Sequence, residues 1–138
     1  MNRTQARCEA FKLIFEIQTQ TEGLNEIIER YKTNNNEGDN KQFNYIMNAV
    51  VGTFEHLERI DEIIEKSLVE GWKINRLSRV SSAILRLAVY EMLYVEYVSH
   101  KVAINQAVEL AKEFDADTAP AFINGVLGGV HNYIDTNV

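Results

Sequence analysis

The residues best suited to catalysis or metal binding are few and scattered along the chain. The three histidines are His56, His100 and His131. Glu96 and His100 are four residues apart, but two ligands do not make a metal site, and Ser99 is expected to break a helix between them. The single cysteine, Cys8, lacks a nucleophile signature and is expected to pack as a small apolar residue. We therefore predict no metal site and no catalytic cysteine.

Sequence motifs of enzymes are also missing. The glycine-rich stretch GVLGG at 125–129 follows no predicted strand and lies in helical periodicity, which favours close packing or a loosened helix over a phosphate loop. No GxSxG, P-loop or HExxH motif occurs. The sequence therefore predicts a protein that is not an enzyme and that uses no cofactor.

Two positively charged regions interrupt a chain whose net charge is −6. Arg3 and Arg7 lie four residues apart near the start, where positive charge would oppose the dipole of a helix N-terminus. We expect both arginines to lie beyond the core, in a tail or an anion-binding role. A second basic region carries no acid and contains Lys73, Arg76, Arg79 and Arg86.

Composition indicates an ordinary globular protein. The chain has 138 residues, of which 46% are hydrophobic and 25% charged, enough for one domain spanning 1–138 with a real core. Neither a membrane span nor a signal peptide is present in the sequence, and the lone cysteine suits a reducing compartment, so we predict a cytoplasmic protein. The acidic balance argues against non-specific binding of nucleic acid.

The elements that position these residues are predicted to be helices. Apolar residues recur at spacings of three and four, which indicates an all-α fold of about six to seven helices. One long helix is predicted from about residue 41 to Gly71, and a helix that is apolar on every side, 83–95, is expected at the centre. The other predicted helices are 3–20, 24–33, 98–114 with Ser99 as N-cap, and one that begins after Thr118 with Pro120 in its first turn.

Some apolar and amide side chains are left without an obvious role in this scheme. Phe11 and Phe15 widen the apolar sector of the first helix beyond one core contact, so either another helix or a partner protein covers them. Asn105 and Asn124 lie among apolar residues, where they either tie two helices together or contact a ligand.

In the order and spacing of several motifs, the sequence resembles the family of the transcription antitermination factor NusB. The opening is similar to the family pattern at Arg3, Ala6, Arg7, Ala10, Ile14 and Phe15. Further similar blocks are IDEII (60–64), RLSRV (76–80), AILRLAVYE (83–91), KVAINQAVELAKEF (101–114) and FINGVL (122–127).

This resemblance implies two small packed helical bundles and a role in binding the boxA element of nascent RNA. It implies a heterodimer with the small-subunit ribosomal protein that acts as NusE, which joins RNA polymerase with other Nus factors and supports ribosomal RNA transcription. The RNA-binding residues carried over are Arg3, Arg7, Thr118 and Phe122. The partner-binding residues carried over are Phe15, Ser81 and Arg86, although Ser81 stands where the family commonly has a charged residue.

Two alternatives remain open at the level of sequence. The same helical module occurs as the non-catalytic N-terminal domain of ribosomal RNA cytosine methyltransferases, but no cofactor-binding domain follows in this sequence, which favours a free-standing factor. A protein-interaction module that pairs with a second copy of itself is the other alternative, because some family members are thought to form dimers.

Overall fold

The computed structural model describes residues 1–20, 23–35 and 40–137, and these residues form helices joined by short connections. The seven α-helices of this described part are α1 (Arg3–Thr19), α2 (Leu24–Asn34), α3 (Asn40–Glu55), α4 (Leu57–Lys66), α5 (Arg79–Tyr94), α6 (His100–Phe114) and α7 (Ala119–Asn137). A short 3-10 helix, Ile74–Arg76, precedes α5. The predicted all-α fold class is confirmed. Part of the loop predicted at 33–40 lies outside the described residues.

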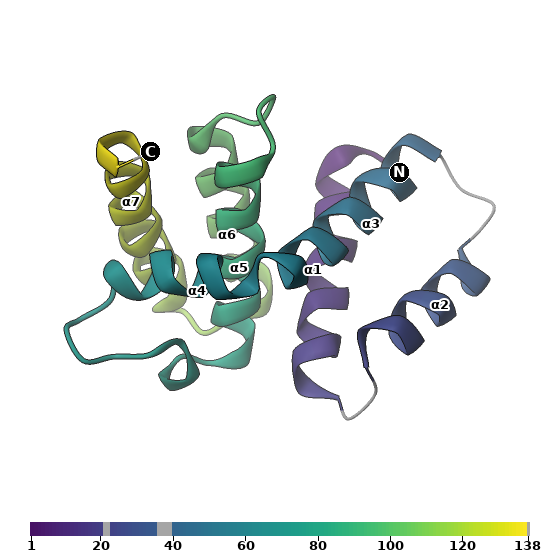
Figure 1. The fold of residues 1–138 in the computed structure, drawn as a ribbon, viewed down its shortest axis with the longest axis horizontal. Coiled ribbons are helices and arrows are strands. Elements are labelled where there is room, and N and C mark those ends of the chain that lie inside the picture. The colour runs from purple at the N-terminus through teal and green to yellow at the C-terminus, as the bar shows by residue number, and fades with distance from the viewer. Residues whose placement is uncertain (21–22, 36–39, 138) are drawn as a thin grey trace.

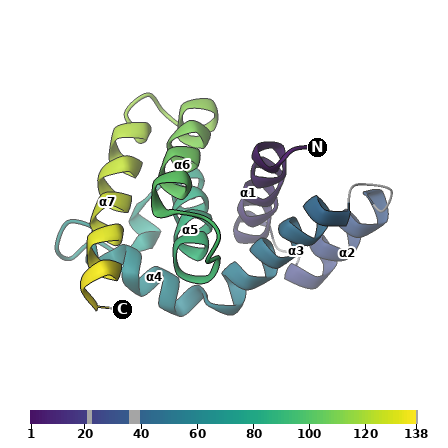
Figure 2. The same cartoon turned by 90° about the horizontal axis from the view of Figure 1, so that it is seen from above.

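The helices form two groups that meet along α1 and α5. Figure 1 shows α1, α2 and α3 on one side of the molecule and α4 to α7 on the other. In Figure 2, α7 and α2 lie at opposite ends, with α5, α6 and α1 between them. Because α1 packs on both α3 and α5, the buried apolar side chains of the two groups form one continuous cluster. The two-bundle arrangement is therefore confirmed.

Helix α5 is the central element, as its apolar sequence predicts. Ten of its sixteen residues are buried, and it contacts α1, α3, α4, α6 and α7. Its start is fixed by Ser78, whose hydroxyl accepts a hydrogen bond from the Ser81 backbone N–H at 3.0 Å. Because most of α5 is buried, side chains that contact solvent or a ligand are expected mainly near its two ends.

The long helix predicted from about residue 41 to Gly71 is wrong, because the chain breaks at His56 into α3 and α4. At the break the His56 ring stacks on Tyr94 of α5 with centroids 4.1 Å apart. One turn earlier, Gly52 lies so close to Tyr90 that an added Cβ would stand 2.3 Å from its ring. The apolar stripe crosses the break, where the chain packs against Tyr90 and Tyr94 of α5. Helix α4 then ends at Lys66, and Gly71 occupies a later turn with φ of +88°.

The beginnings of α6 and α7 follow the predicted signals. The Ser99 hydroxyl accepts from the Val102 backbone N–H at 3.1 Å, and α7 begins directly after Thr118 with Pro120 in its first turn. The glycines at 125–129 lie inside the continuous helix α7. Gly129 packs closely on Ser67, since an added Cβ would lie 2.9 Å from the Ser67 hydroxyl. No helix in the described part of the chain is long and apolar enough to cross a membrane.

Candidate nucleic-acid and partner interface

Arg3 is held at the start of α1 by three side chains from distant parts of the chain. Its Nε donates to Gln42 Oε1 at 2.8 Å and its Nη1 donates to Tyr97 Oη at 3.2 Å. The guanidinium also lies over the Tyr45 ring, 4.2 Å from the centroid. Because Arg3 remains half-exposed, it presents positive charge to solvent in a defined position.

Beside Arg3 is an aromatic groove that sequence reasoning missed. It has a volume of about 490 Å³ and lies between α3 and the C-terminal end of α5, where its aromatic lining residues are Tyr45, His56, Tyr90, Tyr94 and Tyr97. The Tyr97 side chain is 75% exposed. The signal available in the sequence was the close spacing of Tyr90, Tyr94 and Tyr97. Exposed aromatic rings next to a cation suit the stacking of nucleic-acid bases.

Arg7 does not lie beyond the core, and that expectation is wrong. Arg7 is 5% exposed and Glu91 only 1%, and they form a bidentate ion pair with Nε–Oε1 at 2.8 Å and Nη2–Oε2 at 3.0 Å. Burial alone lowers the pKa of Arg7, but the hydrogen bond and charge of Glu91 outweigh it, so the pKa is raised. The arginine is therefore a permanent buried cation that joins α1 to α5.

The other two predicted RNA residues lie together, at a different place. Thr118 and Phe122 are both exposed at the connection from α6 to α7, and the Phe122 backbone N–H donates to the Thr118 carbonyl at 3.4 Å. In Figure 1 this connection lies at the bottom of the molecule, whereas the N-terminus and the α5–α6 connection that carries Tyr97 lie at the top. The four residues thus form two separate groups.

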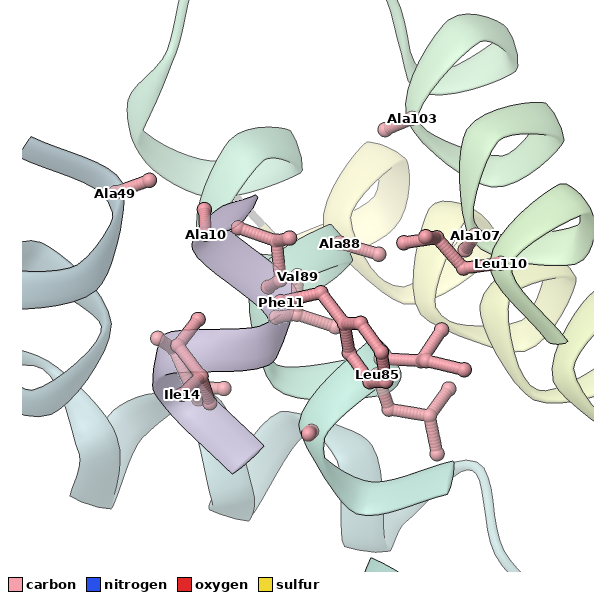
Figure 3. Packing of buried hydrophobic residues seen from close by; sticks show 14 of the residues in the cluster. Ala10, Phe11, Ile14, Ala49, Leu85, Ala88, Val89, Ala103, Ala107 and Leu110 are labelled. Carbon is pink, nitrogen blue, oxygen red and sulfur yellow. The ribbon is translucent and has the colours of Figure 1, made fainter. Parts of the chain in front are cut away.

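The two phenylalanines of α1 differ in their surroundings. Phe11 is buried, with its ring 5.2 Å from that of Phe114 on α6, and Figure 3 shows it projecting from α1 toward Leu85. Another helix of the chain therefore covers Phe11, which was one of the two alternatives. Phe15 is only partly buried, with its ring 6.4 Å from Phe11. Part of its apolar surface therefore stays exposed, and contact with a partner remains a prediction for Phe15.

Ser81 and Arg86, expected to contact a partner, are engaged within the chain. Ser81 is buried and its hydroxyl donates to Asp115 Oδ2 at 2.5 Å. Arg86 donates to both carboxylate oxygens of Asp61 at 2.9 Å and to Gln18 Oε1 at 2.6 Å. These contacts place Ser81 and Arg86 as supports of α4, α1 and the end of α6. Asp115, half-exposed, stands nearer to solvent than Ser81.

The second basic region is partly neutralised by the fold. In addition to the Arg86–Asp61 pair, Lys73 approaches Glu65 with Nζ–Oε1 at 3.8 Å. The Arg76 guanidinium lies over the Trp72 ring at 4.8 Å. Asn105 and Asn124, for which the sequence left a tie between helices or a ligand contact open, are both exposed, which favours the second alternative over a buried tie. Arg76 and Arg3 each lie over an aromatic ring, but only Arg3 is also held by the side chains of Gln42 and Tyr97.

The sequence and the fold were compared with those of known proteins. The model of the NusB family matches residues 4–132. The transcription antitermination protein NusB of Clostridium novyi is 44% identical over 131 residues, covering 94% of this chain and 98% of that protein. A solved structure of NusB from T. maritima superposes with a TM-score of 0.86 at 32% identity, covering 96% of this chain and 92% of that one.

Another similar structure is that of the antitermination factors NusB and NusE in complex with double-stranded RNA. Its TM-score is 0.83 at 28% identity, and the match covers 94% of this chain and 96% of that one. The match of the family model over most of the chain and the identity with curated relatives over nearly their full lengths agree with the helix order and packing described above. The chain belongs to the NusB family of transcription antitermination proteins.

Proposed function

We propose that this chain is a non-enzymatic antitermination factor that binds the boxA element of nascent RNA as a heterodimer with the ribosomal protein acting as NusE. In this role it acts in the cytoplasm with RNA polymerase and other Nus factors and supports ribosomal RNA transcription. The observation that carries the proposal is the close structural similarity to a NusB that was solved with NusE and RNA. From the geometry of the site we propose which side chains of this chain contact the RNA and the partner.

On the RNA side, Arg3 contacts a phosphate and exposed rings stack on bases. Tyr97 beside Arg3 and Phe122 beside Thr118 are the aromatic side chains proposed for stacking, and Phe122 is 37% exposed. Arg7 acts through position, because its pair with Glu91 fixes the helix end that carries Arg3. The contacts to phosphate set the orientation, and the contacts to bases set the sequence preference.

On the protein side, the partner covers Phe15 on α1. Ser81 and Arg86 act indirectly, by holding neighbouring elements in place. Ser81 binds Asp115, and Arg86 binds Gln18 of α1 and Asp61 of α4. The chain carries a net charge of −6, so its average field repels RNA. The chain alone is therefore a weak RNA binder that gains affinity from the partner.

The proposal is tested by titrating a boxA-like RNA with the chain, with the ribosomal partner and with the two together. We expect the mixture to bind the RNA more tightly than either protein alone. Equal affinity for the chain alone and for the mixture would refute the heterodimer. Sedimentation of the chain without RNA reports whether the chain pairs with a second copy of itself.

A pair of variants tests the partner face. Phe15→Ala removes the half-buried ring at the proposed contact, whereas Phe43→Ala removes a half-buried ring that stacks on Tyr31 at 6.2 Å, within the α2–α3 side. Both variants lose packing, but only Phe15→Ala is expected to weaken binding of the ribosomal partner, by roughly tenfold or more if Phe15 is an interface anchor. Calorimetry measures both affinities, and equal losses would show that Phe15 is not at the interface.

A further inference from the structure

Two histidines that are far apart in the sequence meet at the end of the α6–α7 pair. His100 is the first residue of α6, and His131 lies on α7 one turn before Asp135. The two Nδ1 atoms are 2.7 Å apart, and the rings meet edge to face at 89°. His131 Nε2 lies 3.2 Å from Asp135 Oδ2, and His100 Nε2 lies 3.2 Å from the Met92 carbonyl oxygen. Sequence reasoning had considered His100 only with Glu96.

The partners of the two Nε2 atoms fix where the protons are. A carbonyl oxygen and a carboxylate oxygen can only accept hydrogen bonds, so each Nε2 must carry the proton that it donates. In a neutral imidazole the other nitrogen is then bare. When both rings are neutral, the two Nδ1 lone pairs face each other across 2.7 Å, which is repulsive unless a proton on one ring or a metal ion lies between them.

We propose that His100 and His131 form a binding site for a zinc-like transition-metal ion, with both Nδ1 atoms as ligands, the Asp135 carboxylate as the third group of the cluster, and water completing the shell. Imidazole nitrogen is a preferred ligand of such ions. Asp135 and the Met92 carbonyl orient the two rings through their Nε2–H groups, which is the usual arrangement behind a metal-bound histidine. These groups are already assembled, because a ring nitrogen of His100, a ring nitrogen of His131 and a carboxylate oxygen of Asp135 lie within 4.8 Å of one another.

The required adjustment is small. A tetrahedral ion with Zn–N distances near 2.0–2.1 Å separates two ligand nitrogens by about 3.3 Å, so the rings must move apart by roughly 0.6 Å. The His131 side chain, 42% exposed, has room to do so. The N-terminal dipole of α6 opposes a cation at His100, but the Asp135 carboxylate and the C-terminal end of α7 favour one.

Such an ion would cross-link the start of α6 to the last turns of α7. In Figure 1 this end of α7 and the α5–α6 connection lie on the same side, away from the α6–α7 connection with Phe122. The inference does not rest on the proposed function, because zinc binding is measured without RNA or partner.

The test titrates the chelator-treated chain with Zn²⁺ by calorimetry, and with Co²⁺ by visible absorption. We expect one ion per chain and the absorption bands of a nitrogen-ligated Co²⁺. His131→Gln should abolish binding, and Asp135→Asn, which alters only the orienting group, should weaken it by about 10–100-fold. His56→Gln is the matched control, because His56 is an exposed histidine stacked on Tyr94 outside this cluster, and it should bind as the wild type does.

Histidine ring NMR of the wild type keeps the test valid if a variant fails to fold. Zinc should shift the ring signals of His100 and His131 and leave those of His56 in place. Absence of binding, in which case a shared proton relieves the lone-pair repulsion, would overturn the proposal. Wild-type affinity in His131→Gln, or a loss in His56→Gln equal to that in His131→Gln, would also overturn it.

Discussion

At the scale of single residues, the buried Arg7–Glu91 pair is the most consequential feature of the core. It places two opposite charges where α1 crosses α5, under the Tyr45 ring. A helical wheel puts Arg7 at the boundary between two faces, and charged residues are usually exposed, so the sequence favoured a surface position. Its partner is 84 residues away, and no local pattern reveals it.

Removing one member of this pair should be far more costly than removing both. Arg7→Met leaves Glu91 buried without a partner, so we expect the free energy of unfolding to fall by about 3–5 kcal/mol. The double variant Arg7→Met with Glu91→Leu should recover much of that loss. Urea denaturation measures all three proteins, and equal losses in the single and double variants would contradict this account.

Tyr45 gives the protein a dependence on alkaline pH. Burial, reinforced by the charge of Glu91, raises the pKa of its hydroxyl above the ordinary value of about 10. As the pH rises past that value, the unfolded chain loses the Tyr45 proton first, so the free energy of unfolding falls. Tyr45→Phe should weaken this decline.

The same variant should cost little at neutral pH. The Tyr45 hydroxyl is buried beside the Glu91 carboxylate, which keeps both of its hydrogen bonds from Arg7 when the hydroxyl is removed, so no group is left unpaired. Urea midpoints at pH of about 7 and about 10.5 test both statements. An unchanged pH dependence in Tyr45→Phe would assign the alkaline loss to other groups.

At the scale of elements, the helices were largely predictable and their bends were not. The positions of α1, α2, α5 and α6 follow from apolar periodicity and from caps such as Ser99. The break at His56 is invisible to periodicity, because the hydrogen bonds His56 N–Gly52 O and Ile60 N–His56 O keep the helical spacing across it. At the break the chain contacts Tyr90 and Tyr94 of α5, which are distant in the sequence.

Two glycine variants separate a packing role from helix propensity. Gly52→Ala places a Cβ within 2.3 Å of the Tyr90 ring and should destabilise the fold by about 1–3 kcal/mol. Gly125→Ala, on α7, meets open space and should stabilise the helix by up to about 1 kcal/mol. Thermal unfolding measures both, and opposite signs are expected. A stabilising effect of Gly52→Ala would show that Tyr90 moves aside freely.

At the scale of the whole molecule, the candidate site is extended rather than compact. Arg3 with Tyr97 lies at one end of α1, and Phe15 lies twelve residues further along, about 18 Å at the helical rise. The α6–α7 connection, which carries Thr118, lies at the opposite end of the bundle from the α5–α6 connection, which carries Tyr97. The family resemblance predicted RNA contacts for Arg3, Thr118 and Phe122, but the sequence could not show that the fold separates them. Arg3 and Tyr97 are 94 residues apart in the sequence, and only the fold brings them together.

The salt dependence of RNA binding by the heterodimer tests the central claim most directly. For single-stranded RNA, the slope of log K against log salt is about −0.7 per phosphate contacted. Arg3→Ala should therefore make the slope shallower by about 0.7. Arg59→Ala, at an exposed arginine of α4 paired with Glu62, should leave it unchanged. A wild-type slope in Arg3→Ala would contradict the assignment of Arg3 to the RNA.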